Sequence, residues 1–324
     1  MIDRSLKWYE GKKIIITGAS GYIASSICEK LYSKADLIIR LSRKNLKPKQ
    51  NCEDSKDDIS LIETWKKLLP EVDVIFHLAS QTSIYRSAHD TQEDFNANVK
   101  PMNSILGACK DYNFSPFIIF AGSATQVGIT KVNPVNENNI DLPITFYDLH
   151  KLISEKLLEG YSNQGIVKGT TLRLPNIYGP GEKSSSSDRG VINQMVKKAL
   201  NKETLTVYGK GDQLRDYLYI DDLVDALLRS AQHQDKVNKQ HFILGTGRGI
   251  SISEAFKIIA SKVSKTIDKK VNIISIKEPK DLSKIESRSF IANSNLYQSL
   301  TNWSPTIEFD TGIDKTIEFF NKRN

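Results

Sequence analysis

The first half of this chain alternates short apolar runs with segments in which apolar residues recur at helical spacing. Strands that are buried on both faces read as continuous apolar runs, and such strands belong to parallel sheets. The apolar runs occupy residues 12–18, 35–42, 72–79, 116–122 and 169–176. The helical segments between them occupy residues 25–34, 61–69, 97–112 and 148–162. This alternation predicts an α/β fold in which helices cover both faces of a parallel sheet.

The regular alternation ends near residue 180, where shorter elements begin. A chain of 324 residues can bury a large core, as one α/β unit or as two domains. We expect a first domain over residues 1–174 and a smaller second domain over residues 175–324. The chain is expected to return to the first domain around residues 215–245.

Composition excludes several classes of protein. The net charge of +7 is spread along the chain without a dense block of Lys and Arg, which fits an anionic small ligand better than a nucleic acid. The three cysteines lie far apart and the five histidines are scattered, so we expect reduced thiols and no bound metal. No apolar run approaches the roughly 20 residues of a membrane span, and the N-terminus lacks the apolar core of a signal peptide. We therefore expect a cytoplasmic protein that binds neither nucleic acid nor membrane.

The sequence ITGASGYIASS joins the first predicted strand to the first predicted helix. Gly18 permits a tight turn there, and Gly21 lets the backbone approach a pyrophosphate whose charge the helix N-terminus stabilises. The third small position is Ala24, which helix–strand packing tolerates in place of glycine. An ordinary strand-to-helix turn is the alternative, but a turn at the first strand of an alternating chain favours dinucleotide binding.

The end of the second predicted strand bears on which dinucleotide binds. An NAD site places a carboxylate there for the ribose diol, whereas an NADP site avoids that charge and supplies a cation. The chain has Ser42 and Arg43 at this point, followed by Lys44, with no acidic residue beside them. We interpret Ser42 and Arg43 as contacts of the 2′-phosphate of NADP(H). The alternative is that the basic loop is merely solvated and that the cofactor is NAD(H).

Tyr147 and Lys151 are four residues apart in a predicted helix, so their side chains share one face. A lysine ammonium beside a phenol lowers the pKa of the phenol from about 10. Tyr147 then becomes usable as an acid and base near neutral pH. Because both residue types are common in this chain, the pair by itself also has a purely structural interpretation.

Further motifs accompany this pair along the chain. They are TGxxGxxA at the first turn, HLAS at 77–80, Asn98, a strand that ends in SAT at 123–125, LRLPNIYGPGE at 172–182 and GKGDQLRDYLYIDDLVDAL at 209–227. Together they resemble the extended short-chain dehydrogenase/reductase family of NAD(P)-dependent nucleotide-sugar epimerases, dehydratases and reductases, over nearly the whole chain. The resemblance implies a Rossmann-like, doubly wound parallel sheet that binds the dinucleotide. It also implies a smaller C-terminal α/β domain that mainly binds the nucleotide-diphosphate sugar.

The resemblance also implies roles for individual residues. Ser123, Tyr147 and Lys151 are the implied catalytic residues, and the Ser123 hydroxyl bonds the sugar oxygen that is oxidised or reduced. The implied cofactor-binding residues are Gly18, Ser20, Gly21, Tyr22, Ile23, Ser42, Arg43, Asp58, Ile59, Leu78, Ala79, Ser80, Asn98, Tyr147, Lys151 and Pro175. The implied substrate-binding residues are Gln81, Thr125, Asn176, Val191, Val207, Tyr208 and Arg215.

The residues after Ser123 bear on the reaction. The family's dehydratases place an acidic residue directly after the strand-end hydroxyl, because elimination of water needs an extra acid and base. Here Ala124, Thr125 and Gln126 follow, and none of them does that work. Dehydration is therefore disfavoured. Two kinds of enzyme remain: a 4-epimerase with tightly bound NAD, and a reductase that consumes NADPH.

Ser42 and Arg43 favour the reductase, since NADPH is the usual cellular reductant. The AGSxxQVG pattern, in which Val127 replaces the family's usual tyrosine, is also similar to nucleoside-diphosphate 4-keto-6-deoxyhexose reductases. We predict NADPH-dependent reduction of a 4-keto nucleotide sugar in glycan or deoxysugar biosynthesis, with the 4-epimerase as the alternative. A 4,6-dehydratase or a non-catalytic dinucleotide-sensing protein is less favoured. The resemblance further implies a homodimer formed by pairing long helices.

Overall fold

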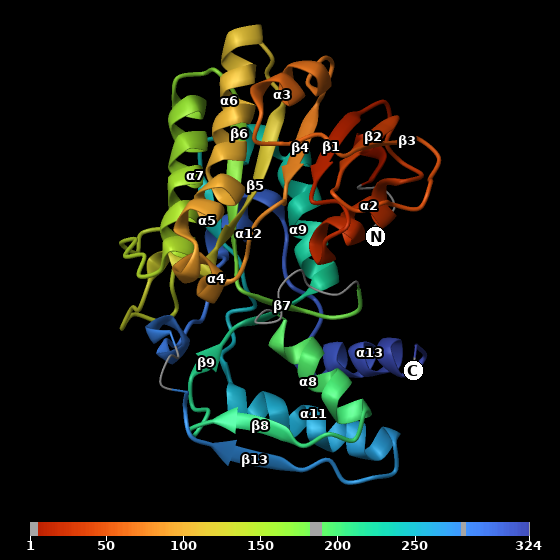
Figure 1. Cartoon of the computed structure of the whole chain (residues 1–324), viewed down its shortest axis with the longest axis vertical. Helices are drawn as coiled ribbons and strands as arrows, with labels where there is room; N and C mark the ends of the chain where they lie inside the picture. The colour runs from red at the N-terminus through yellow and green to blue at the C-terminus, as the bar shows by residue number, and fades with distance from the viewer. Residues whose placement is uncertain (1–5, 182–189, 280–282, 324) are drawn as a thin grey trace.

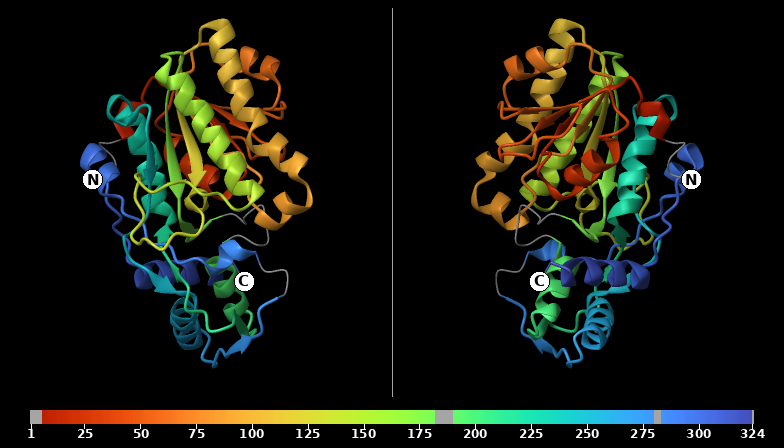
Figure 2. Two further views of the ribbon diagram at one scale, coloured as in Figure 1. Left: turned by 90° about the vertical axis from the view of Figure 1, so that its left-hand side faces the viewer. Right: turned by 90° about the vertical axis from the view of Figure 1, so that its right-hand side faces the viewer.

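The computed structural model describes residues 6–181, 190–279 and 283–323. Figure 1 shows a large sheet with helices around it and, below, a smaller part that contains α8, α11 and α13. The two views of Figure 2 show the same division, with the smaller part below one edge of the sheet. The molecule is thus a large α/β unit with a smaller unit at one end.

A seven-stranded sheet forms the large unit, and each pair of neighbouring strands in it is parallel. The strand order is β11-β6-β5-β4-β1-β2-β3, so the chain starts in the middle, builds one half and then returns to build the other. This doubly wound, Rossmann-like arrangement confirms the predicted fold class. The strands are β1 (Lys13–Thr17), β2 (Leu37–Leu41), β3 (Cys52–Ser55), β4 (Val74–His77), β5 (Phe117–Ser123), β6 (Lys168–Leu174) and β11 (His241–Ile243).

The continuous apolar runs follow from burial on both faces. In β1, Ile14 and Ile16 pack into a core with α2 and α9, whereas Ile15 packs into a second core with α3, α6 and α7. Successive side chains of a strand point to opposite faces, so a sheet covered on both sides needs apolar residues at every position. The helices concerned are α2 (Tyr22–Leu31), α3 (Ile62–Leu68), α6 (Lys100–Tyr112), α7 (Phe146–Asn163) and α9 (Ile220–Gln232).

Two strands of the sheet lie outside the five predicted apolar runs. β3 has the polar sequence CEDS and forms one edge, where the buried Arg40 of β2 bonds Asp54 at 2.6 and 2.9 Å. β11 forms the other edge, beside β6, and is reached only after the chain has left the sheet and returned through α9 and α10 (Gln234–Val237). Neither strand carries an apolar run long enough to predict it.

The smaller unit contains the parallel pair of β8 (Leu205–Tyr208) and β13 (Ile273–Ile276) with three helices, α8 (Val191–Leu200), α11 (Ile252–Thr266) and α13 (Phe309–Asn321). Two further pairs are parallel β7–β10 (Asn176–Tyr178 with Tyr217–Tyr219) and antiparallel β9–β12 (Leu214–Arg215 with Ile250–Ser251). The remaining helices are η1 (Lys7–Tyr9), α4 (Ile84–His89), α5 (Thr91–Asn98), η2 (Ala124–Val127), η3 (Lys284–Ser287) and α12 (Asn295–Thr301).

The strands β1, β4 and β5 all end at the edge of the sheet that faces the smaller unit (Figure 1). Their register places Thr17 opposite His77, and His77 opposite Phe120, three residues before the end of β5. Ligands of open α/β sheets bind at the carboxyl ends of the strands. The carboxyl edge of the sheet is therefore the expected place of the predicted site residues.

Candidate active site

The turn between β1 and α2 exposes backbone rather than side chains. Gly18 has a φ of +69°, and a Cβ atom there would lie 2.9 Å from the Cα atom of Ala79. Gly21 is the N-cap of α2, no side chain caps the helix, and its N–H donates to the carbonyl of Gly18 at 2.7 Å. An uncapped helix N-terminus behind a glycine turn is suited to a pyrophosphate. Ser20 lies in the same turn, and Tyr22 and Ile23 begin α2. The residues present therefore fit a dinucleotide.

We expect Gly18→Ala to weaken dinucleotide binding at least about tenfold, because the methyl group would displace the backbone at Ala79. The loss would be measured by titrating the protein with NADH and NADPH and following their fluorescence. Gly165→Ala is the matched control, since Gly165 also has a positive φ (+74°) but has nothing within 4 Å of its added Cβ. Equal loss of affinity in both variants would contradict the role of the close approach.

Thr17, at the end of β1, holds the loop that follows β4. Its hydroxyl accepts the backbone N–H groups of Leu78 at 3.0 Å and Ala79 at 2.9 Å, and it lies 3.0 Å from Nδ1 of His77. Burial, together with the charge of Lys151, lowers the pKa of His77 to about 3. His77 therefore stays neutral at physiological pH, buried at the end of β4.

The residues predicted for the adenosine end follow the neighbouring strands β2 and β3. Ser42 is buried and its hydroxyl accepts the N–H of Lys44 at 3.0 Å, whereas the Arg43 side chain is exposed. Asp58 is exposed and accepts the N–H of Ser60 at 2.8 Å, the largest of the effects that lower its pKa. The carbonyl of Ile59 accepts the Trp65 indole N–H at 2.7 Å. An exposed cation next to β2 remains available to a phosphate.

A buried polar network lies under the loop after β4. Ser80 donates to the side chain of Asn98 at 2.6 Å, and Gln81 donates to Asp94 at 2.6 Å. Asp94 is 0% exposed and its other oxygen lies 2.6 Å from Nδ1 of His150 on α7. The Gln81 amide, predicted to contact substrate, is thus used to hold the loop. The sequence motifs did not reveal Asp94 or His150, because their pairing joins positions 56 residues apart.

Ser123 is the last residue of β5, and Tyr147 and Lys151 lie on α7. All three are buried, with 8%, 6% and 3% exposure. The Lys151 ammonium donates to the carbonyl of Ala121 at 2.8 Å, and the Ser123 hydroxyl lies 2.7 Å from that of Thr125. The structure therefore brings a strand-end hydroxyl pair and a lysine held against the same strand to one edge of the sheet. Tyr147 is one helical turn before that lysine.

Asp148, directly after Tyr147, is fully buried. Its Oδ2 accepts the N–H of Thr145 at 3.2 Å in a capping box that begins α7. Burial raises its pKa above the usual range for aspartate, while hydrogen bonding from Thr125 and Thr145 and the charge of Arg288 oppose that rise. The carboxylate fixes the start of the helix that carries Tyr147.

The predicted substrate residues lie on several elements around the smaller unit. Asn176 begins β7 and is half-buried, and Pro175 precedes it. In β8 the side chains alternate, so Val207 packs into the core while Tyr208 is 46% exposed. Val191 is exposed at the start of α8. The core position of Val207 is a consequence of strand alternation that the motif alone did not reveal.

Arg215 is buried in β9, and its guanidinium is engaged by the segment around η3. It donates to the carbonyl of Arg288 and, at 2.7 Å, to that of Glu286, whose carboxylate lies 3.5 Å away. Arg288 is also buried and donates to the carbonyl of Ala124 at 3.1 Å, next to the end of β5. Arg288 thus joins the strand end to Arg215. No spacing in the sequence indicated it, because it lies 164 residues from Ala124.

A hollow lies away from the predicted site residues. It measures about 390 Å³ and is lined by Tyr217, Ile250, Ile307 and Phe309 among others, and by none of the predicted site residues. No group of three or more His, Cys, Asp or Glu in residues 6–181, 190–279 and 283–323 could hold a metal ion. Of the helices in these ranges, none is long and apolar enough to cross a membrane.

Comparison with known proteins matches this geometry to one family. The sequence profile of the NAD dependent epimerase/dehydratase family matches residues 14–245. The chain is 27% identical to UDP-glucose 4-epimerase of Mycolicibacterium smegmatis, covering 96% of this chain and 99% of that protein. It is 27% identical to UDP-glucuronic acid decarboxylase 1 of Danio rerio, covering 96% and 73%. The crystal structure of UDP-glucose 4-epimerase from Thermotoga maritima with UDP-glucose has a TM-score of 0.84 at 26% identity, covering 96% and 99%.

Proposed function

The chain belongs to the NAD dependent epimerase/dehydratase family, and from this premise we propose that it interconverts two nucleotide-diphosphate sugars that differ at carbon 4. It is an NAD(P)-dependent nucleotide-sugar enzyme by family. The similarity to UDP-glucose 4-epimerases favours this reaction over reduction, and the strand end disfavours elimination. The strand end offers hydroxyls but no carboxylate directly after Ser123, beside a helix with Tyr147 and Lys151. Reversible oxidation of an alcohol needs one acid/base and a hydrogen-bond donor, and no second acid for elimination.

Each residue of this site has a role in the proposal. Tyr147 takes the proton of the sugar hydroxyl as it is oxidised and returns it to the ketone oxygen as it is reduced. The Ser123 hydroxyl accepts the N–H of Thr125 at 3.3 Å and lies 2.7 Å from the Thr125 hydroxyl. When Thr125 is the donor of that second bond, the proton of Ser123 is available to donate to the sugar oxygen. Lys151 supplies a positive charge beside the phenol. The bound nicotinamide would supply reversible hydride chemistry at carbon 4.

The same proposal places the dinucleotide along the carboxyl edge of the sheet. The turn at Gly18 and Gly21 would hold the pyrophosphate, and Asp58 with Ile59 the adenine. Ser80 and Asn98 would shape the site near the nicotinamide. Arg215, Asn176 and Tyr208 would face the sugar nucleotide. The expected homodimer stays a prediction, and the exposed Phe95, Phe146 and Leu149 on α5 and α7 are apolar residues that such a pairing would cover.

The test is incubation with a panel of nucleotide sugars that includes UDP-glucose, UDP-galactose, UDP-glucuronic acid and 4-keto nucleotide sugars. Product masses and the absorbance of NAD(P)H at about 340 nm are measured. An epimerase returns its electrons to the sugar, so this absorbance should show no net change. Interconversion of isomers of equal mass without net consumption of NAD(P)H supports the epimerase. Loss of carbon dioxide or of water, or reduction at the expense of NADPH, overturns it in favour of the corresponding reaction.

The reductase that the sequence favoured stays as a second candidate, because the end of β2 has Ser42 and an exposed Arg43 in place of a carboxylate. On this candidate the 2′-phosphate of NADPH bonds Arg43. Arg43→Ala should then weaken NADPH binding at least about tenfold, because a charge-assisted hydrogen bond contributes about 1.5–3 kcal/mol, and leave NADH unchanged. Lys44→Ala, at the next exposed cation, is the control. Equal binding of NADPH and NADH by the native protein would remove this candidate.

A further inference from the structure

The end of β5 is joined to α7 by buried polar side chains. Oε1 of Gln126 accepts the backbone N–H of Ser123 at 2.6 Å, and its Nε2 donates to Oε2 of Glu155 at 2.9 Å. Gln126 is 0% exposed and Glu155 is 1% exposed, so both bonds are shielded from water. A single amide therefore connects the backbone of Ser123 to the helix that carries Tyr147.

Glu155 lies on the same face of α7 as Tyr147 and Lys151, because the three residues follow one another at intervals of four. Lys151 donates to the carbonyl of Ala121 in β5 at 2.8 Å. The helix is thus tied to the strand at two successive turns, through Ala121 and through Gln126. These two hydrogen-bonded links lie one helical turn apart, so together they oppose sliding and rotation of α7 on β5.

Gln126 also completes the turn that orients the Ser123 hydroxyl. Ser123 is the N-cap of η2, and Gln126 supplies the other half of the same capping box. Within that turn the Ser123 hydroxyl accepts the N–H of Thr125 at 3.3 Å. The position of the Ser123 side chain therefore depends on the Gln126 amide being in place.

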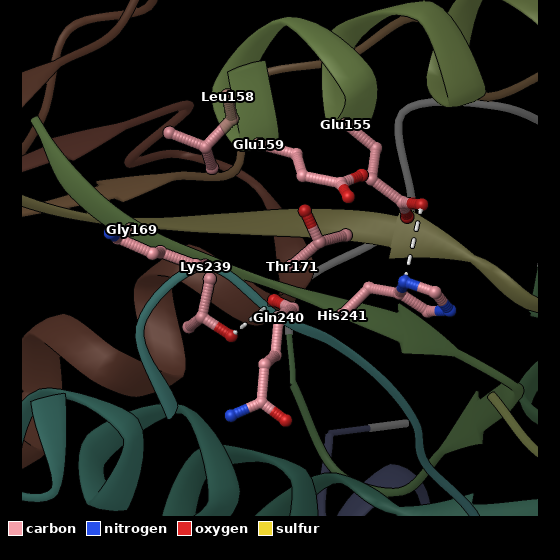
Figure 3. Close-up of a pocket in the computed structure, with 9 residues that line it drawn as sticks. Glu155, Leu158, Glu159, Gly169, Thr171, Lys239, Gln240 and His241 are labelled. Carbon is pink, nitrogen blue, oxygen red and sulfur yellow. Dashed lines mark hydrogen bonds and ion pairs between the residues drawn. The ribbon is translucent and has the colours of Figure 1, made fainter. Parts of the chain in front are cut away.

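The surroundings leave this link little freedom. A Cβ atom on Gly122 would lie 2.9 Å from Oε1 of Gln126, so the amide occupies space that only glycine provides. Glu155 is held by Arg173 at 2.5 and 2.9 Å, and Figure 3 shows it turned from α7 toward His241, 3.8 Å away. The cavity beside it measures about 10 Å³, enough for about one water molecule. Glu155 is thus a fixed anchor for Gln126.

From this geometry we propose that Gln126 is a positioning residue, which sets the separation of Ser123 and Tyr147 by linking the end of β5 to Glu155. The inference rests on the proposed function, because it takes Ser123 and Tyr147 as residues that contact the reacting oxygen. Displacement of reacting groups by about 1 Å lowers turnover by up to about 10²-fold. The affinity for dinucleotide and for the nucleotide part of the substrate depends on other residues.

The test uses Gln126→Glu, which keeps an acceptor for Ser123 but sets a carboxylate against Glu155. We expect kcat to fall about tenfold or more on the nucleotide sugar of the panel that the native protein converts. KM and the NADH dissociation constant, measured by fluorescence, should change less than about twofold. The double variant Gln126→Glu/Glu155→Gln exchanges the two groups and restores a donor facing an acceptor. It should recover the lost kcat in part, because Nε of Arg173 also donates to Oε2 of Glu155 and would face the exchanged amide.

Asp141→Asn is the control for stability, because Asp141 bonds Arg173 at 2.5 and 2.8 Å at the far end of the same network. It should lower Tm and leave kcat unchanged. Ser123→Ala tests the site itself, and full activity of that variant would overturn the proposed function. An inactive Ser123→Ala beside a fully active Gln126→Glu would overturn only the positioning role. So would a loss of kcat in Gln126→Glu that follows Tm and is not recovered in the double variant.

Discussion

Tyr147→Phe is expected to lower kcat by a factor of about 10² to 10⁴, the usual contribution of a general acid/base. The variant keeps the ring that packs with Ile84 and Ile285 and loses only the hydroxyl that exchanges a proton with the sugar. Tm and the dissociation constant of NADH should therefore stay close to those of the native protein. Turnover of the panel substrate, Tm and NADH fluorescence are the three measurements.

Tyr161→Phe is the matched control, since Tyr161 lies on the same helix and packs partly buried against the core on the α3, α6 and α7 side of the sheet. Loss of its hydroxyl should leave kcat within about twofold of the native value, the scale of an ordinary surface change. If Tyr147→Phe retained most of its activity, Tyr147 would have only a packing role. The proposed chemistry would then need another acid/base.

Arg173→Met should destabilise the protein by about 3–5 kcal/mol, the range observed when one partner of a buried ion pair is removed. The Arg173 side chain is 1% exposed and neutralises Glu155, also 1% exposed, and Asp141. Methionine fills much of the same volume but leaves the carboxylate of Glu155 buried without its cation. Unfolding in denaturant, followed by circular dichroism, measures the loss.

Lys168→Met is the control for the ion pair, because Lys168 lies on the same strand as Arg173 and pairs with Asp235 at 3.1 Å on the surface. Exposed pairs contribute about 0–1 kcal/mol, so this variant should unfold nearly as the native protein does. A similar small loss in Arg173→Met would mean that Glu155 is protonated or solvated when the arginine is removed. The network would then contribute little to stability.

The large sheet could be predicted because its strands are buried on both faces and therefore apolar throughout. The edge strands escaped prediction for the opposite reason. β3 is polar, held to β2 by the Arg40–Asp54 pair, and β11 is three residues long. A strand at an edge has fewer neighbours to pack against and needs less apolar surface, so its sequence carries little signal.

The glycine turn and the Tyr147–Lys151 pair were accessible from sequence because each depends on local spacing. A turn requires glycine where φ is positive, and a helix places residues four apart on one face. The same locality indicated the family through its motifs. The local motifs did not decide the reaction. Ser42 and Arg43 favoured a reductase, whereas we propose an epimerase because several relatives are 4-epimerases.

The sequence by itself therefore determined the doubly wound sheet, the family, and the local motifs at its carboxyl edge, because periodicity and turn chemistry act over a few residues. Only the tertiary structure decided which side chains meet. It paired Gln126 with Glu155, turned Gln81 to Asp94, and placed Arg288 against Ala124. These contacts join residues 13 to 164 positions apart on different elements. They arise from the packing of helices and loops on the sheet, which no local pattern encodes.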